Sequence, residues 1–186
     1  MTPRRLAVKA LIHQEQAGYA NLVLDAELKK CTPPLDSRDA AFAARIFYTT
    51  LERLPLLDYR INQFTKKPVA KLDAPVRAVL RAGLAQALYM NVPLPAAVNE
   101  SVKLTRALGK SSAAGMVNAV LRRAQRESEA LLAELEHDPV VRTAHPRWLQ
   151  KSLKAFWPEQ WEAICAANNA HPPMILRVNQ IGRAHV

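Results

Sequence analysis

The sequence predicts an all-α protein, and three observations support that prediction. Apolar residues recur at helical spacing through most of the first 126 residues, whereas positions 174–178 are the one good strand candidate. Prolines and glycines divide the helical patterns into short, well-bounded segments. Between Leu72 and Arg123, three such patterns follow one another almost without a gap, each with an apolar stripe and a cationic face. We expect this run to organise a seven-helix bundle at 3–126.

The expected helices begin and end at ordinary signals. Thr2-Pro3 and Asp36 precede the first and third helices, and Gly18 and Gly109 follow the first and sixth. The first four helices are expected at 3–17, 21–30, 37–53 and 55–64. After a basic loop at 66–71, three more are expected to begin at Asp73, Pro95 and Ser111 or Ser112, the last of them ending near residue 126.

Helical spacing also predicts which side of each helix is buried. The expected inward residues are Leu22, Val23 and Ala26 in the second helix, Ala41, Ala44, Ile46, Phe47, Tyr48 and Leu51 in the third, and Val76, Val79, Leu80, Gly83, Leu84, Ala87 and Leu88 in the fifth. Glycine inside a helix costs about 1 kcal/mol relative to alanine. Gly83 within this stripe therefore indicates that another helix approaches closely.

Positive charge is concentrated in the expected bundle. The chain has a formal net charge of +10, and residues 1–126 hold 20 Lys and Arg against 9 Asp and Glu. Residues 127–186 hold only 6 against 7. This asymmetry favours a module that binds a polyanion, followed by a nearly neutral segment.

Three groups of cations are the candidate binding residues. The expected RNA-binding set is Arg4, Arg5 and Lys9 on the first helix, Lys103, Arg106 and Lys110 on the sixth, and Arg122 and Arg123 on the seventh. For any one of them, the alternative is a solvated face with local ion pairs such as Glu100–Lys103. Aromatic residues make up only 6% of the chain. We therefore expect cations to recognise the RNA backbone and shape, rather than aromatic side chains to stack on RNA bases. Asn99 and Asn118 could contact RNA or tie two helices together.

Nothing in the sequence indicates catalysis, a metal site or a cofactor site. The five histidines are scattered, and Cys31 and Cys165 are far apart without a CxxC pair. There is no glycine-rich phosphate loop, and the acidic pairs Asp36/Asp39 and Glu134/Glu136 are better explained as caps or solvated faces. The unpaired cysteines favour a reducing, cytoplasmic setting. No apolar run approaches the roughly 20 residues needed to cross a membrane.

The character of the chain changes after residue 126. We expect a helical linker at 127–170, with an acidic helix at 127–136 and helices at 145–157 and 158–168. The His171-Pro172-Pro173 sequence ends the helical pattern, and a strand is expected at 174–178 within the incomplete start of a second subdomain at 171–180.

These residues resemble a known family. The stretch 76–123 resembles the core of the NusB-like domain, in the version at the N-terminus of the RsmB (Fmu/Sun) family of 16S ribosomal RNA cytosine-5 methyltransferases. Supporting segments are Arg4–Leu11, Tyr19–Leu22, Asp39–Leu51, Leu54–Asp58, Leu72-Asp73, the HPxWL sequence at 145–149, and 167–179. A free-standing NusB-type antitermination factor is the alternative, but it would be expected to end soon after the seventh helix.

The resemblance implies an RNA-binding domain of an enzyme whose catalytic part is not contained in this chain. The implied partner is 16S rRNA, the implied state is a cytoplasmic monomer, and S-adenosylmethionine is implied only for the full-length parent. Cys31 and Cys165 do not fall in the family's catalytic motifs and inherit no role. The last six residues, 181–186, do not resemble the family and equal one reading frame of a common sequencing adapter. We therefore expect them to be a non-native tail.

Overall fold

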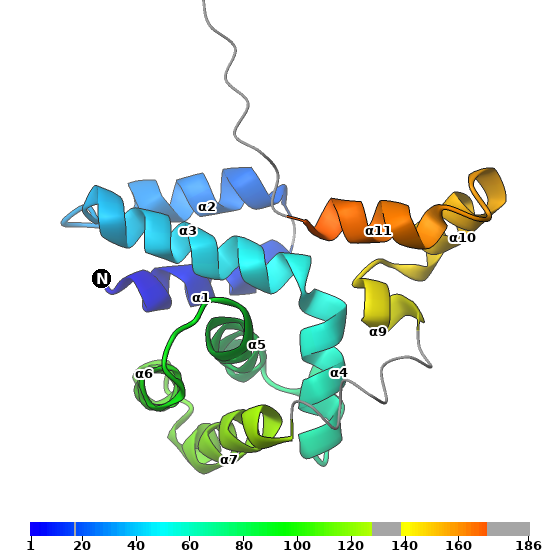
Figure 1. The fold of residues 1–186 in the computed structure, drawn as a ribbon. Helices are drawn as coiled ribbons and strands as arrows, with labels where there is room; N and C mark the ends of the chain where they lie inside the picture. Colours follow the sequence, from blue (N-terminus) through cyan, green and yellow to red (C-terminus); the bar gives the residue numbers. More distant parts are fainter. Residues whose placement is uncertain (17, 128–138, 171–186) are drawn as a thin grey trace, which may run out of the picture.

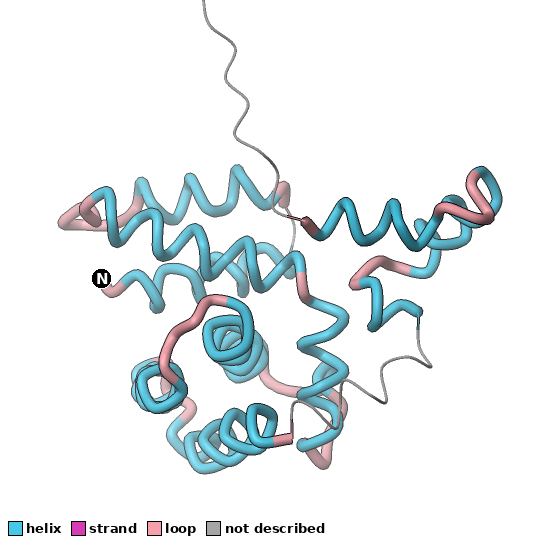
Figure 2. Tube along the Cα trace, in the orientation of Figure 1, coloured by secondary structure: helices cyan, strands magenta, loops and turns pink. Residues whose placement is uncertain are grey.

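The computed structural model describes residues 1–16, 18–127 and 139–170, and all regular structure in those residues is helical (Figure 2). The elements are α1 (Pro3–Gln16), α2 (Ala20–Lys29), α3 (Ser37–Glu52), α4 (Leu54–Phe64), η1 (Val69–Lys71), α5 (Ala74–Tyr89), α6 (Leu94–Ala107), η2 (Ser111–Ala113), α7 (Ala114–Arg126), α9 (Pro139–Thr143), α10 (Arg147–Phe156) and α11 (Trp161–Asn169). The expected all-α bundle is confirmed. The acidic helix at 127–136, the strand at 174–178, the second subdomain and the tail at 181–186 fall wholly or almost wholly outside the described residues.

Helix α5 lies at the centre of the bundle, surrounded by α1, α3, α4, α6 and α7 (Figure 1). Its sequence explains this position, because nearly every residue from Val76 to Gln86 is buried. A helix whose apolar residues spread this widely around it is stable only when neighbours cover it, and its buried polar side chains Arg81 and Gln86 are hydrogen-bonded. The expected inward stripe is confirmed at its centre, whereas Ala87 and Leu88 are only half-buried at its end.

Gly83 is where α5 approaches its neighbours most closely. A Cβ atom added there would lie 2.7 Å from Ser101 Oγ on α6 and 3.0 Å from two carbons of Leu121 on α7. The prediction of a close helix contact at Gly83 is therefore confirmed. The absence of a side chain at Gly83 lets α6 and α7 pack closer to α5 than a larger residue would allow.

The predicted inward faces of α2 and α3 are partly wrong. Leu22 and Ala26 of α2 are exposed, and Leu24 and Glu27 are buried in their place. Glu27 is held by His13 at 3.0 Å and Lys30 at 3.0 Å, and a pattern of apolar residues cannot reveal an inward carboxylate.

In α3, Ala41 and Tyr48 are exposed, and Ala43 and Thr50 are buried instead. The Thr50 hydroxyl donates a hydrogen bond to Ile46 O at 2.7 Å, which satisfies it inside the helix. A buried threonine of this kind leaves no trace in an apolar pattern.

Helices α9, α10 and α11 extend from the bundle beside α4 (Figure 1). Helix α9 was not predicted, and it packs Val141 against Leu56 of α4. The helices expected at 145–157 and 158–168 are present as the shorter α10 and α11. Arg53 joins the extension to the bundle, because Nη2 donates to Asn169 O at 3.2 Å and the guanidinium lies 5.5 Å from the Tyr89 ring centroid.

Candidate RNA interface

The cations of α1 differ in how firmly they are held. Arg4 is half-buried, donates Nε to Gln86 Oε1 at 2.7 Å and lies over the Phe42 ring at 5.0 Å. Arg5 is exposed and Lys9 is half-buried. Within the part of the chain that the structure describes, the side chains of Arg5 and Lys9 have no hydrogen-bond or ion-pair partner. These two cations are therefore available to an external anion, whereas Arg4 already supports the fold.

Lys103 and Arg106 of α6 are exposed, whereas Lys110, which the sequence placed on the same helix, lies beyond its end at Ala107 and is half-buried. Two of these three cations are paired. Lys103 contacts Glu100 at 2.8 Å, as the local ion-pair alternative predicted, and Lys110 contacts Asp73 at 2.6 Å. Arg106 is exposed and has no such partner among the described residues. The hydrogen bond from Lys103 lowers the pKa of Glu100, and the charge of Arg4 contributes to the same direction.

The arginines of α7 crowd its C-terminal end, where the helix dipole favours cations. Arg122 donates Nε to Asn118 Oδ1 at 3.0 Å. Because both residues lie on α7, this hydrogen bond does not link two helices. Arg123 contacts Glu127 at 2.9 Å and lies over the Phe64 ring at 4.8 Å. Arg126 contacts Glu127 at 3.4 Å. These are exposed contacts, which compete weakly with a polyanion.

A hollow of about 340 Å³ lies between the α6 cations Lys103 and Arg106 and the first turns of α7. We name it the α6–α7 groove; it is lined by Asn99, Val102, Lys103, Arg106, Ala114, Gly115 and Asn118. A Cβ at Gly115 would meet nothing within 4 Å, so the wall is open at that point. Both asparagines singled out in the sequence line this groove, together with two of the eight predicted cations.

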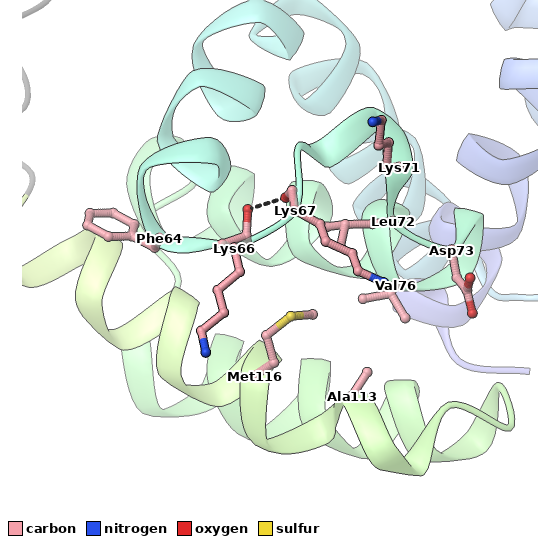
Figure 3. A pocket seen from close by; sticks show the side chains of 10 residues that line it. Phe64, Lys66, Lys67, Lys71, Leu72, Asp73, Val76, Ala113 and Met116 are labelled. Carbon is pink, nitrogen blue, oxygen red and sulfur yellow. Dashed lines mark hydrogen bonds between the residues drawn. The ribbon is translucent and has the colours of Figure 1, made fainter.

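A second hollow lies on the other side of the start of α7. This lysine cavity, of about 500 Å³, is lined by Phe64, Thr65, Lys66, Lys67, Lys71, Leu72, Asp73, Val76, Ala113 and Met116 (Figure 3). Two predicted cations border it, since Lys110 pairs with Asp73 and Arg123 lies on Phe64. The hydrogen bond from Lys110 lowers the pKa of Asp73, and Lys67 adds to this effect.

Sequence reasoning noticed the basic loop at 66–71 but did not place it at a binding site. It also missed a partly buried ion network that fixes α1 and α4 onto α5. Arg81 donates Nε and Nη2 to Asp58 at 2.6 and 2.7 Å, and both Arg81 and Arg77 pair with Glu15. The available signal was the presence of two arginines inside the otherwise apolar stripe of α5. The network is structural, because its cations are already neutralised.

No group of three His, Cys, Asp or Glu side chains among the described residues could hold a metal ion. Both cysteines in the described part are buried and free. No described helix is both long enough and apolar enough to cross a bilayer. What the geometry supplies is a set of cations around two hollows at the α6–α7 end of a helical bundle.

The chain folds as a helical bundle with a basic surface. Comparison with known proteins identifies the family to which this bundle belongs. Residues 1–126 match the NusB family, and residues 145–184 match the ferredoxin-like domain of the RsmF/B-like methyltransferases. The chain belongs to the NusB family.

Curated relatives resemble the whole chain. Ribosomal RNA small subunit methyltransferase B of Pseudomonas putida is 53% identical over 97% of this chain and 41% of its own length. The protein of the same name in Pseudomonas syringae pv. tomato is 51% identical over 97% of this chain and 40% of its own. The chain thus spans about two fifths of the length of the relatives it matches.

Two solved structures share the fold. The crystal structure of PH0851 superposes with a TM-score of 0.69 at 17% identity, covering 92% of this chain and 40% of that one. A chain in the crystal structure of a plectonemic RNA supercoil gives a TM-score of 0.63 at 16% identity, covering 68% of this chain and 93% of that one.

Proposed function

We propose that this chain is the RNA-binding N-terminal domain of an S-adenosylmethionine-dependent 16S rRNA 5-methylcytosine methyltransferase. The observation that carries the proposal is the match of 97% of the chain to relatives named ribosomal RNA small subunit methyltransferase B. The cations around the α6–α7 groove supply the chemistry, because phosphate contacts from Lys and Arg dominate affinity for nucleic acid. The chain acts as a cytoplasmic monomer in this proposal.

Methyl transfer itself belongs to the part of the relatives that this chain does not span. S-adenosylmethionine would supply the methyl group in the full-length parent. The residues described here bind and orient the RNA and carry out no chemical step. Cys31 and Cys165 are buried at 5% and 0% exposure, which fits a packing role and not a nucleophilic one.

Salt dependence of RNA binding tests the proposal. If about four phosphates of a single-stranded RNA are neutralised, the slope of log affinity against log salt should be near −3. Reversing the charge of Arg5, Lys9, Lys103 and Arg106 together should reduce the magnitude of that slope and weaken binding at least about a hundredfold at low salt. The matched control reverses four exposed cations elsewhere, namely Arg38, Arg147, Lys151 and Lys154. Equal losses in both variants, or no retention of RNA in a filter-binding assay, would contradict the proposal.

A NusB-type antitermination factor that binds RNA with a protein partner is the second candidate, since residues 1–126 alone match that family. The match at 145–184 favours the methyltransferase, because it lies outside the bundle. Recovery of a ribosomal protein in stoichiometric complex with the chain would favour the second candidate. Failure to retain RNA would instead favour a helical protein-interaction module without an RNA role.

A further inference from the structure

The lysine cavity is lined by none of the cations proposed above to bind phosphates, and its lining differs from the surface around those cations. Its floor is apolar, formed by Phe64, Leu72, Val76, Ala113 and Met116. In Figure 3, the Ala113 and Met116 side chains point up from η2 and α7 into the cavity, and Val76 points down towards them from α5. A volume of about 500 Å³ lies within the range of pockets that hold small organic groups.

Cations stand at the rim of this floor. Lys66 extends towards α7 and Lys67 extends towards Val76 and Asp73, whereas Lys71 lies on the far side of the loop (Figure 3). Asp73 is the one carboxylate in the lining, and Lys110 already holds it at 2.6 Å. The rim therefore presents uncompensated positive charge beside an apolar surface, which suits a ligand with a flat apolar part and anionic neighbours.

We propose that the lysine cavity receives one unpaired nucleotide of the bound RNA, with its base on the Val76–Met116 floor and its flanking phosphates against Lys66 and Lys67. The inference rests on the proposed RNA-binding function and extends it from backbone contacts to base insertion. A thioether is a favourable partner for an aromatic ring, and Met116 supplies one at the centre of the floor. RNA sites commonly take splayed, unstacked bases in this way.

The position of the cavity favours a nucleotide over an acidic peptide. Ala113 lines the lysine cavity and Ala114 lines the α6–α7 groove, so adjacent residues at the start of α7 contribute to both hollows. Lys110 stands between them, one turn along the chain from Arg106 and in contact with Asp73. A strand of RNA held by Lys103 and Arg106 can therefore continue across η2 into the cavity.

The test compares RNA with and without bases on a protein whose cavity is filled. A twelve-nucleotide oligouridylate and a ribose-phosphate chain of equal length without bases carry the same charge. The wild-type chain should bind oligouridylate roughly tenfold more tightly, the size expected for one buried base. Ala113→Phe fills the cavity without changing any charge, so it should abolish that preference. Ala119→Phe is the matched control, because Ala119 is exposed on α7 and lines neither hollow, and it should keep the preference.

A second measurement does not depend on a core-facing substitution. Lys66→Gln with Lys67→Gln should reduce the salt slope for oligouridylate by about 1.4, the value for two lost phosphate contacts. Lys151→Gln with Lys154→Gln on α10 should leave the slope unchanged. If the wild type binds neither oligomer, the proposed function fails. If it binds RNA but Ala113→Phe keeps the base preference, or the Lys66/Lys67 variant keeps the slope, the cavity inference is overturned while RNA binding stands. Binding of an acidic peptide in competition with oligouridylate at the cavity, with no preference for bases, would also overturn it.

Discussion

Gly83 of α5 lies against Leu121 of α7 so closely that an added Cβ would sit 3.0 Å from both terminal carbons of Leu121. The same Cβ would lie 2.7 Å from Ser101 Oγ. We predict that Gly83→Val lowers the free energy of unfolding by roughly 2 kcal/mol, because overpacking a filled core costs more than the gain in helix propensity returns. Urea denaturation followed by circular dichroism measures this change.

The control for this prediction is Gly115 on α7, where a Cβ would meet nothing within 4 Å. Gly115→Ala should raise the free energy of unfolding by about 0.5–1 kcal/mol through helix propensity alone. Ser101→Ala should also relieve part of the cost of Gly83→Val when the two are combined, because it removes the Oγ atom that lies 2.7 Å from the added Cβ. Stabilisation by Gly83→Val would show that the two helices separate more easily than the geometry indicates.

The carboxylate of Glu15 should make stability depend on pH. Burial raises its pKa, but the hydrogen bond from Arg77 and the charge of Arg81 outweigh burial, so the pKa lies below its usual value of 4.5. A lowered pKa in the folded state stabilises the fold above about pH 4.5, and that contribution is lost as the pH falls through the lower folded value. Glu15→Gln should cost about 2 kcal/mol at pH 7.

The difference between the wild type and Glu15→Gln should shrink as the pH falls below 4.5, when the wild-type carboxylate is also neutralised. Thermal unfolding at a series of pH values measures this convergence. Glu159→Gln, at an exposed position, should follow the wild type throughout. A gap between wild type and Glu15→Gln that stays constant down to pH 2 would show that the loss is due to packing and not to charge.

Two buried arginines should respond to substitution in opposite directions. Arg60 is 2% exposed, and its Nε and Nη1 atoms have no hydrogen-bond partner among the described residues. Arg81 is 9% exposed but is fully engaged by Asp58 and Glu15. Arg60→Met should raise the free energy of unfolding by about 1 kcal/mol, because it removes a desolvated charge and keeps the volume. Arg81→Met should lower it by about 3 kcal/mol, because it leaves the Asp58 carboxylate without its partner and Glu15 with Arg77 alone.

Guanidinium chloride denaturation of both variants decides this prediction. Arg60→Lys serves as the control for removal of the charge, since it keeps the positive charge and should not stabilise the protein. Equal destabilisation by Arg60→Met and Arg81→Met would mean that Arg60 has a compensating interaction.

The sequence predicted the helices well because their signals are local. Prolines and glycines bound the segments, and Asp36 does accept a hydrogen bond from Asp39 N at 2.7 Å as a helix cap should. Asp73 was expected to cap α5 in the same way, but its carboxylate contacts Lys110 instead. Local sequence cannot show whether Asp73 caps its helix or pairs with a distant cation, because Lys110 lies 37 positions away.

The candidate site could be predicted only as a set of cations. Which of them adjoin depends on how helices far apart in sequence pack, and no periodicity contains that information. Lys66 and Lys67 look like an ordinary basic loop until α7 places Met116 beside them. Arg4 looked like a phosphate ligand, but Gln86 and Phe42 hold it against the bundle. Long-range packing thus added one hollow to the site and gave Arg4 a structural contact.

Helix α10 should bind apolar dyes. Trp148 near the start of α10 is 69% exposed, and Phe156 and Trp157 at its end are 75% and 50% exposed. Several exposed large apolar side chains on one short helix mark a surface that usually meets another part of a protein. Because the chain spans about two fifths of its curated relatives, the longer proteins have further residues that could cover this face.

We predict that anilinonaphthalene sulfonate fluoresces strongly with this chain and that Trp148→Ser with Phe156→Ser at least halves the signal. Tyr48→Ser on α3, 38% exposed, should leave it nearly unchanged. An unchanged signal in the double variant would place the dye elsewhere and leave α10 without a role in contact with other domains.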